Sequence, residues 1–297
     1  MTNLTQRVLV ALVAVPLIVF LSVQGGWYFY AMVAFIATLG LHEFYTLAVK
    51  KGTQAQVLVG LVFGFCIVTV FLWVRVRPMG WLWTGSQALA FLFLVFTAII
   101  FTIELFRNKG SALLNVATTI LGVSYVSLFL GSLIGIRELL AAGPVPTTSA
   151  SSTAFQAETI DHGGATIISI FVAIWMCDSL AYFAGRMFGR HKLFERVSPN
   201  KTWEGAIAGY LGADMTFIAA QQFVLPYMTV VDAFICGSIV GVFGQIGDLA
   251  ESLLKRDAGV KDSSALIPGH GGVLDRFDSL IFVSPLLYLF LRLVVLG

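Results

Sequence analysis

Long apolar runs separated by short polar segments fill most of this chain. Each run approaches the length of about 20 residues with which a helix crosses a bilayer. They are residues 8–24, 27–49, 55–76, 81–106, 111–140, 164–188, 203–226, 230–254 and 279–296. A membrane barrel strand would alternate apolar and polar residues, whereas a helix satisfies its backbone hydrogen bonds internally in lipid. The pattern therefore predicts an all-α, polytopic integral membrane protein of about nine transmembrane helices.

Two of the runs raise separate questions. The run 111–140 is long enough to tilt or break, and we expect this at Gly131 or Gly135. The first run follows Arg7 as the apolar core of a signal peptide would, but similar runs come after it and no small-residue cleavage site does. We therefore expect a retained first span.

The segment 141–163 is rich in Ser, Thr, Gly and Pro, which is typical of a loop. We expect it to be extracytoplasmic, with Asp161 and His162 as solvated loop residues. It divides the chain into N-terminal transmembrane helices at 1–140 and a C-terminal transmembrane region at 164–297. The polar residues of the C-terminal region predict a catalytic role for it.

Composition agrees with membrane residence. Of the 297 residues, 58% are hydrophobic and 11% are charged, against about 25% charged residues in soluble domains. The net charge of +2 is too small to indicate a nucleic-acid partner. Cys66, Cys177 and Cys236 lie in apolar runs without metal-type spacing, so we interpret them as core residues and not as disulfides or zinc ligands.

Lysine and arginine predict the orientation, because they are enriched in cytoplasmic segments. With the N-terminus in the cytoplasm, the basic residues expected on that side are Arg7, Lys50, Lys51, Arg107, Lys109, the block from Arg186 to Lys201, and those from Lys255 to Arg276. The basic residues expected elsewhere are Arg75, Arg77, Arg137 and Arg292. The opposite topology would place most basic residues outside, so we expect a cytoplasmic N-terminus.

Acidic residues gather in the C-terminal half, in cytoplasmic loops or towards the cytoplasmic ends of spans. They are Asp178, Glu195, Glu204, Asp248, Glu251, Asp257, Asp262, Asp275 and Asp278. Charges in or near spans are expensive and usually face a polar cavity or a partner. This half should therefore contain a hydrophilic site that opens to the cytoplasm.

Two clusters come early in this half. Asp178 and Arg186 share one helical face with Trp175 and Tyr182, either as a packing ion pair or as partners of a bound ion and an anionic ligand. In the second cluster, Ser198 or Asn200 is expected to cap the helix that follows. Free N–H groups at a helix start favour phosphate, and Lys201 adds a positive charge; a capped helix with a lysine at the lipid headgroups is the structural alternative.

A third cluster is a polar stripe of Asp248, Glu251, Ser252 and Lys255, at spacings i, i+3, i+4 and i+7 of an apolar run. Two carboxylates one turn apart suit Mg²⁺, which prefers oxygen ligands. Lys255 and the adjacent Arg256 are placed to meet phosphates that such a cation bridges. A buried salt-bridge stripe without any ligand is the alternative.

The fourth cluster spans 261–279 and combines Lys261 and Asp262, a Pro-Gly-His-Gly-Gly turn, and an Asp-Arg-Phe-Asp step. Glycines around His270 let the backbone approach a ligand closely, as phosphate-cradling loops do. His270 itself is either a metal ligand or base, or a loop hydrogen-bonding residue. The carboxylates and cations on both sides of the turn make this cluster the more specific signal.

Together the clusters predict metal-assisted chemistry at phosphorus. One or two Mg²⁺ ions held by acidic residues stabilise the attacking and leaving oxygens of an in-line displacement, while basic residues neutralise polyphosphate. The chain contains no GxxxxGK[ST], HExxH or GxSxG motif.

The stretch from Ser252 to Asp278 closely resembles the C-terminal motif of the phosphatidate cytidylyltransferases, or CDP-diacylglycerol synthases. It reads S-x2-K-R-x4-K-D-x4-hydrophobic-P-G-H-G-G-x2-D-R-x-D. The earlier W-x2-D-x2-A-Y-x2-G-R and S-P-N-K-T-x-E-G clusters also resemble that family. Leu41-His42-Glu43 resembles that family only weakly, and we assign it no role.

This resemblance implies an Mg²⁺-dependent reaction of CTP with phosphatidate, in which the lipid phosphate attacks the α-phosphorus of CTP. It implies the bilayer of the bacterial inner membrane, a site that faces the cytoplasm and, from the family alone, a homodimer. The implied metal ligands are Asp248, Asp275, Asp278, Glu251 and Asp178, and the implied catalytic residues are Asp248, Asp275, Asp278 and Lys255. The implied substrate-binding residues are Arg186, Ser198, Asn200, Lys201, Ser252, Arg256, Lys261, His270, Gly271, Gly272 and Arg276.

Two other functions stay open from the residues alone. A CDP-alcohol phosphotransferase would carry a D-G-x2-A-R…G…D…D motif, which we do not find. An ion-coupled transporter would place carboxylates near the bilayer midplane and show inverted repeats. Asp178 and Asp214 are the candidate ion sites for that reading, and Asp214 fits it better than it fits the enzyme.

Overall fold

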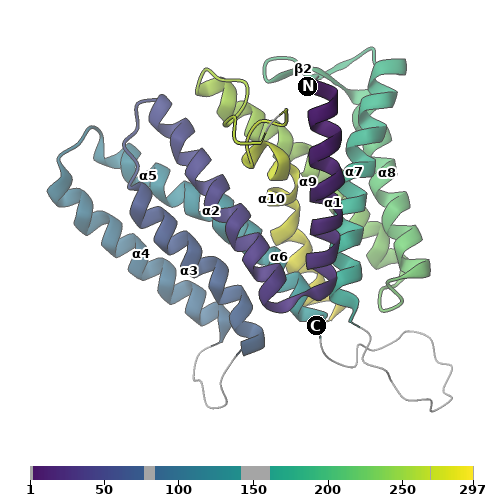
Figure 1. The fold of residues 1–297 in the computed structure, drawn as a ribbon, viewed down its shortest axis with the longest axis horizontal. Helices are drawn as coiled ribbons and strands as arrows, with labels where there is room; N and C mark the ends of the chain where they lie inside the picture. The colour runs from purple at the N-terminus through teal and green to yellow at the C-terminus, as the bar shows by residue number, and fades with distance from the viewer. Residues whose placement is uncertain (1–2, 77–83, 142–160, 268, 297) are drawn as a thin grey trace. The chain divides into compact units, whose positions relative to one another are not determined.

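The computed structural model describes residues 3–76, 84–141, 161–267 and 269–296, which are mostly helical (Figure 1). Most of the predicted loop lies outside these residues. The helices are α1 (Asn3–Gln24), α2 (Gly26–Lys50), α3 (Val57–Val76), α4 (Gly85–Arg107), α5 (Ala112–Gly122), α6 (Phe129–Leu139), α7 (His162–Phe188), α8 (Trp203–Phe223), α9 (Val230–Asp257) and α10 (Leu274–Phe290). Two π-helical segments are η1 (Val123–Leu128) and η2 (Leu291–Val295).

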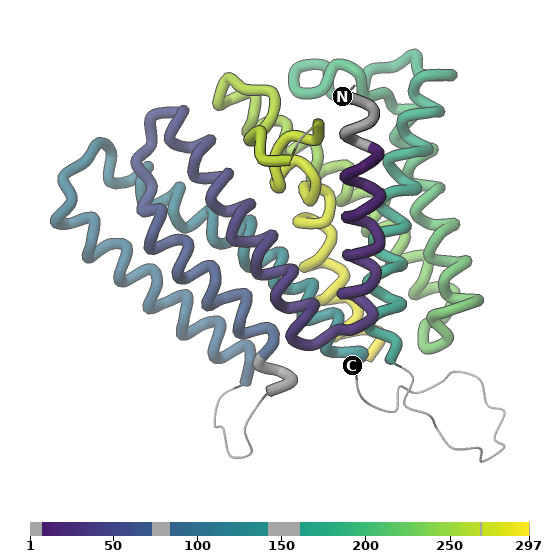
Figure 2. Tube along the Cα trace, in the orientation of Figure 1, coloured from purple at the N-terminus to yellow at the C-terminus, as the bar shows by residue number. Residues whose placement is uncertain are grey.

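A small antiparallel hairpin, which the sequence did not predict, connects α7 to α8 (Figure 2). Its strands are β1 (Lys192–Phe194) and β2 (Ser198–Thr202). The expectation that Ser198 or Asn200 caps α8 is wrong, because both residues lie in β2. Thr202 is the N-cap, and its hydroxyl accepts a hydrogen bond from the Gly205 N–H at 3.2 Å. The helix begins only where the strand pairing ends.

The chain divides into two compact units. Unit 1 comprises Met1–Leu17, Gly26–Gly135 and Leu253–Phe277. Unit 2 comprises Ile18–Gly25, Ile136–Ser252 and Asp278–Gly297. Four helices, α1, α6, α9 and α10, therefore contribute residues to both units.

Unit 1 is built around α2 and α3, which pack against each other and against η1, with α4 and α5 beside α3. Its core includes the fully buried side chains of Phe96 and Ile100. A buried polar network completes it. Gln56 Nε2 donates to Glu104 Oε2 at 2.8 Å, and Asn115 Nδ2 donates to Glu104 Oε1 at 2.7 Å. The buried carboxylate is thus satisfied by hydrogen bonds, as interior polar groups require.

Unit 2 owes its close helix packing to glycines of α8 that face α7. A Cβ atom at Gly205 would lie 2.6 Å from the Ala181 carbonyl oxygen, and one at Gly209 would lie 2.8 Å from the Cys177 carbonyl oxygen. Small residues let helix backbones approach closely. This matters in membranes because the hydrophobic effect does not drive helices together there, and association depends on close packing. The contact holds the end of α7 beside the start of α8.

Six described helical segments are long and apolar enough to cross a bilayer. They are Gly26–Lys50, Gly85–Arg107, Ala112–Leu139, His162–Phe188, Val230–Asp257 and Leu274–Val295. Shorter apolar stretches are Val8–Gln24 and Val57–Leu72. Large apolar side chains also lie exposed on these helices, as lipid contact requires; Leu105 on α4 is 80% exposed. The chain is a helical integral membrane protein, as predicted. Because α8 is not among the six, the count of nine spans stays a prediction.

The long run 111–140 is interrupted, but not at the expected residues. Regular α-helix gives way to the π-helical segment η1 at 123–128, before both Gly131 and Gly135. Gly131 instead makes room for a neighbouring ring, because a Cβ atom there would lie 2.7 Å from Phe71 Cδ2. Such π-helical segments are typical interruptions of long helices.

Asp161 and His162 were expected to be solvated loop residues. His162 is instead buried in the first turn of α7, and Asp161, although its side chain is 42% exposed, is paired. Asp161 caps α7 by accepting from the Gly163 N–H at 3.0 Å, and its two oxygens accept from the Arg137 guanidinium at 2.8 and 2.5 Å. The Arg137 side chain is 1% exposed and also donates to the carbonyl oxygens of Ser22 and Val23. Within unit 2, Arg137 therefore ties the end of α1 to the start of α7.

Candidate functional site

The predicted site residues fall into two groups, one in each unit. In unit 2, Asp178, Arg186, Asn200, Lys201 and Asp248 line a pocket with a volume of about 480 Å³, whereas Ser198, Glu251, Ser252 and Asp278 are not among its lining residues. Its lining residues come from α7, the hairpin, α8 and α9. They are Asp178, Ala181, Tyr182, Gly185, Arg186, Leu193, Asn200, Lys201, Thr202, Gly205, Ala206, Gln245 and Asp248.

The pocket forms where α7, α8 and the hairpin converge. Tyr182 and Arg186 are one turn apart on α7, and Arg186 Nη1 donates to the Tyr182 hydroxyl at 3.0 Å. A Cβ atom at Gly185 would lie 3.1 Å from the Thr202 hydroxyl, so a small residue lets the hairpin lie against α7. Asp178, one turn earlier on the same face, completes the α7 wall.

An ion pair between Lys201 and Asp248 crosses this pocket. Lys201 Nζ lies 2.5 Å from Asp248 Oδ2, and the side chains are 25% and 34% exposed. Ser252, one turn along α9, donates to Asp248 Oδ1 at 3.3 Å. The sequence placed these residues in one site but did not predict that they pair. Partial exposure leaves both charges accessible to a ligand.

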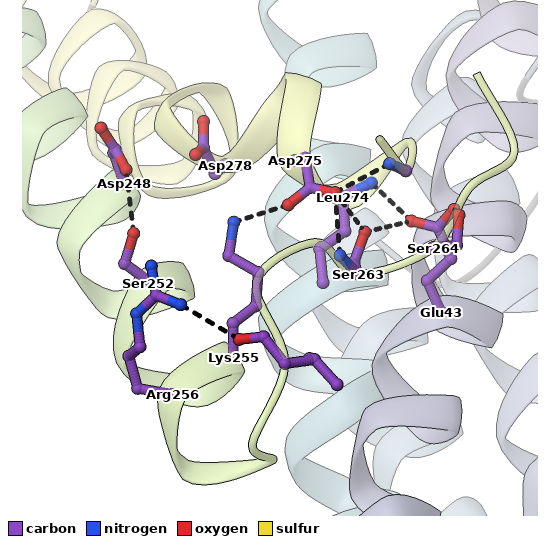
Figure 3. Close-up of polar contacts among 12 residues, drawn as sticks. Glu43, Asp248, Ser252, Lys255, Arg256, Ser263, Ser264, Leu274, Asp275 and Asp278 are labelled. Atoms are coloured by element: carbon purple, nitrogen blue, oxygen red, sulfur yellow. Dashed lines mark hydrogen bonds and ion pairs between the residues drawn. The ribbon is translucent and has the colours of Figure 1, made fainter. Parts of the chain in front are cut away.

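In unit 1, the carboxylate of Asp275 accepts four hydrogen bonds (Figure 3). Lys255 Nζ donates to Oδ1 at 2.6 Å. Ser263 donates to Oδ2 from its backbone N–H at 2.9 Å and from its hydroxyl at 2.8 Å, and the Gly272 N–H donates at 2.7 Å. Asp275 is therefore anchored to both ends of the loop that precedes α10.

The glycine-rich turn of this loop is tightly folded. Gly269 and Gly271 have φ of 74° and 79°, a backbone conformation that favours glycine. The Ile267 N–H donates to the Gly271 carbonyl at 2.8 Å, and the His270 N–H donates to the Ile267 carbonyl at 2.9 Å. A Cβ atom at Gly272 would overlap the hydroxyl of Ser263. The glycines thus let the loop close over Asp275.

Glu43 of α2 is the residue that sequence reasoning missed. Its carboxylate accepts from the hydroxyls of Ser263 and Ser264 and from the N–H groups of Val273 and Leu274 (Figure 3). A usable signal was present, because an ionisable residue within an apolar span is by default a functional candidate. The sequence alone could not show its partners, which lie more than 200 positions away.

Other predicted residues lie at the surface or in the interior. Arg256, Lys261 and Arg276 are exposed, whereas Glu251 is 0% exposed. Asp278 accepts a hydrogen bond from the Ser279 N–H at 2.6 Å. No group of three or more His, Cys, Asp or Glu side chains within the described residues is arranged to hold a metal ion. The Mg²⁺ prediction therefore depends on fewer carboxylates acting together with a substrate.

Asp214, the candidate ion site of a transporter, is buried within unit 2. The Ser238 hydroxyl donates to its Oδ1 at 3.3 Å, and the Tyr210 and Ser238 hydroxyls lie 3.0 Å apart. A Cβ atom at Gly237 would lie 2.5 Å from the same carboxylate, so α9 approaches α8 closely here. Asp214 does not line the pocket described above.

Each group, taken by itself, carries charges suited to phosphate. Unit 2 presents the cations Lys201 and Arg186 and the carboxylates Asp178 and Asp248 in one pocket. Unit 1 presents a buried Lys–Asp pair beneath a glycine-rich turn. The contacts described above include no Ser–His or Cys–His pair of the kind that forms a covalent intermediate. The described geometry therefore favours catalysis by positioning and charge neutralisation.

Comparison with known proteins gives consistent matches along nearly the whole chain. Residues 5–294 match the model of the cytidylyltransferase family. A phosphatidate cytidylyltransferase from Synechocystis sp. is 34% identical over 300 residues, which cover 98% of this chain and 97% of that protein. Proteins of the same name from Staphylococcus epidermidis and Staphylococcus aureus are 31% and 33% identical, over 96% of this chain and 98% of each relative.

Proposed function

This chain belongs to the cytidylyltransferase family, and we propose that it makes CDP-diacylglycerol from CTP and phosphatidate by a metal-assisted displacement at phosphorus. The overall reaction is the one that the name of its relatives describes, and it is a step of phospholipid biosynthesis. An oxygen of the lipid phosphate bonds to the α-phosphorus of CTP. The bond from that phosphorus to the oxygen bridging to the β-phosphate breaks, and pyrophosphate leaves with the bonding electrons.

The observation that carries this proposal is the pairing of Lys201 with Asp248 in the unit 2 pocket. We expect Lys201 to exchange its carboxylate partner for the triphosphate when CTP enters. Arg186, on the α7 wall, would bind a second phosphate, since a guanidinium suits phosphate oxygens. Gln245 is held by hydrogen bonds from its amide to the Ala206 and Gly241 carbonyls, which supports the rigid wall that selective binding requires.

The carboxylates of this pocket fit Mg²⁺. Proteins usually hold this ion through one or two carboxylates together with substrate phosphates and water, and Asp178 and Asp248 line one pocket with room for a triphosphate. When bound, Mg²⁺ stabilises negative charge on the reacting phosphates. The further ligands predicted from the sequence are Glu251, Asp275 and Asp278.

The basic residues of unit 1 complete the proposal. Lys255 is fixed by Asp275, so its charge is held in one place with little loss of side-chain freedom on binding. Exposed Arg256, Lys261 and Arg276 are candidates for the lipid phosphate and the leaving pyrophosphate. Positioning and charge neutralisation of this kind suffice for transfer at phosphorus.

Orientation and assembly belong to the same proposal. Every second segment between the predicted spans is rich in Lys and Arg, which supports about nine spans and a cytoplasmic N-terminus. In this orientation the site opens to the cytoplasm. The bacterial sources of the relatives support residence in an inner membrane. A homodimer is expected from the family.

The experiment that tests this proposal uses the purified protein in detergent with CTP, phosphatidate and Mg²⁺. We expect CDP-diacylglycerol and pyrophosphate in equal amounts, with product formation stopped by a chelator and restored by Mg²⁺. The chelator should leave the helical circular dichroism unchanged. Absence of product with any divalent ion would contradict the enzymatic proposal. Full turnover in excess chelator would contradict its metal-assisted part.

A further inference from the structure

Glu43 lies on α2, yet all of its described hydrogen-bond partners lie in the loop 263–274 (Figure 3). Oε1 accepts from the Ser264 hydroxyl at 2.6 Å and from the Val273 N–H at 3.0 Å. Oε2 accepts from the Ser263 hydroxyl at 3.0 Å and from the Leu274 N–H at 2.8 Å. The residue is 4% exposed. This carboxylate therefore holds the loop at both of its ends.

The two backbone donors lie at the start of α10, which begins at Leu274. The first N–H groups of a helix have no partner within the helix, and a negative charge there is stabilised by the helix dipole. Such groups are usually capped by a neighbouring residue in the chain. Here Glu43, from another helix of unit 1, caps α10.

The capped end carries Asp275, the next residue along the chain. The Ser263 hydroxyl lies 3.0 Å from Glu43 Oε2 and 2.8 Å from Asp275 Oδ2, so one hydroxyl lies between two carboxylates. A Cβ atom at Gly272 would lie 2.5 Å from Glu43 Oε2. The Ser263 hydroxyl therefore links Glu43 directly to the Asp275 carboxylate, and Gly272 leaves the room that this arrangement needs.

We propose that Glu43 is a positioning residue for the reaction, which fixes the glycine-rich loop and the carboxylate of Asp275 without touching substrate. The inference rests on the proposed cytidylyltransferase function. Its chemical basis is that reacting groups must be held in place, because a displacement of about 1 Å can cost on the order of a hundredfold in rate.

The contacts explain why the residue is a glutamate and not a glutamine. Each carboxylate oxygen faces one backbone N–H, and a backbone N–H can only donate. A glutamine would place its NH₂ group against the Val273 N–H or the Leu274 N–H, whichever way its amide turned. Glu43→Gln should therefore leave one of these two N–H groups, at the start of α10, without its acceptor, although it preserves the shape of the side chain.

Glu104 provides the matched control. It is also a buried carboxylate of unit 1, with donors from Gln56, Asn115 and Arg107. Its partners are all side chains, and none belongs to the loop. Glu104→Gln should disturb the general stability of unit 1 without changing the loop.

The test compares both variants with the wild type in the full chain, by hydrogen exchange of residues 263–274 and by steady-state kinetics. For Glu43→Gln we expect faster exchange at Val273 or Leu274, whichever N–H loses its acceptor, and a fall in kcat of at least about tenfold. KM for CTP should change by less than about threefold, because none of the described hydrogen-bond partners of Glu43 lines the nucleotide pocket. Glu104→Gln should leave both loop exchange and kcat near wild type.

Unchanged exchange at Val273 and Leu274, or unchanged kcat, would overturn the proposal. An equal loss of kcat in Glu104→Gln would do the same, since the effect would then be general destabilisation. If Glu43→Gln does not fold, Ser264→Ala removes one of the four hydrogen bonds, and the same two readouts decide. An inactive wild type would overturn the proposed function, while the exchange data would still show whether Glu43 holds the loop.

Discussion

The ammonium nitrogen of Lys255 lies 2.6 Å from Oδ1 of Asp275, and the two side chains are 11% and 3% exposed. Removing one partner of a buried ion pair leaves an uncompensated charge, which costs about 3–5 kcal/mol. The same two residues belong to the motif that resembles the cytidylyltransferases. Variants at either position therefore change stability as well as activity, and the two effects have to be separated by experiment.

Asp275→Asn should abolish turnover. It should also lower the free energy of unfolding by about 3–5 kcal/mol, because the neutral amide leaves Lys255 without its charged partner. Pyrophosphate release measures the first effect, and thermal unfolding in detergent measures the second. Near-normal turnover by the folded variant would remove Asp275 from the reacting site.

A double variant separates structure from chemistry at this pair. Asp275→Asn combined with Lys255→Met has no unpaired buried charge, so we expect it to recover much of the lost stability. Its turnover should stay absent, since both charges that we propose for the reaction are missing. Recovery of turnover together with stability would show that the pair acts only in folding.

Lys201→Met should weaken CTP binding. A charge-assisted contact contributes roughly 1.5–3 kcal/mol, so KM for CTP should rise on the order of tenfold to a hundredfold. The matched control is Lys51→Met, which removes the exposed ion pair with Asp257. Exposed pairs contribute about 0–1 kcal/mol, and this variant should behave as wild type. An equal effect of both variants would contradict a specific role for Lys201.

Gly272→Ala should disable the enzyme, because the added Cβ atom would overlap the Ser263 hydroxyl and press on the Glu43 carboxylate. The control is Gly244→Ala in α9, where the added Cβ would make an ordinary contact at 3.7 Å with Ser279 Cβ. Alanine is favoured over glycine within a helix by about 0.5–1 kcal/mol, so the control should be at least as stable as wild type. Kinetics and thermal unfolding of both variants check this, and a fully active Gly272→Ala would show that the loop tolerates displacement.

Much of the membrane fold could be predicted from the sequence, because a helix in lipid needs a long apolar run and the runs are plainly visible. The hairpin 192–202 was missed because its strands have only three and five residues, too few to show the apolar alternation that reveals a buried strand. The salt bridge between Arg137 and Asp161 was also missed. Asp161 follows a Ser- and Thr-rich segment that is typical of a loop, so a buried arginine partner could not be inferred from its neighbours.

The candidate site was predicted in part. The dense motif 252–278 marked Lys255 and Asp275, and the structure shows that they pair directly. Glu43 could be marked as a candidate by its place in an apolar span, but its partners could not be predicted, because they lie in a loop more than 200 residues later. Spacing within a helix can be read from a sequence, whereas the pairing of distant segments depends on packing.

The fate of the CTP phosphates distinguishes displacement at the α-phosphorus from other reactions. With CTP labelled at the α-phosphorus, we expect the label to enter the lipid product, CDP-diacylglycerol. With CTP labelled at the γ-phosphorus, we expect all released label to be pyrophosphate and none to enter lipid. Transfer of the γ-label to lipid, or release of the α-label only into water-soluble products in the presence of phosphatidate, would contradict displacement at the α-phosphorus by the lipid phosphate.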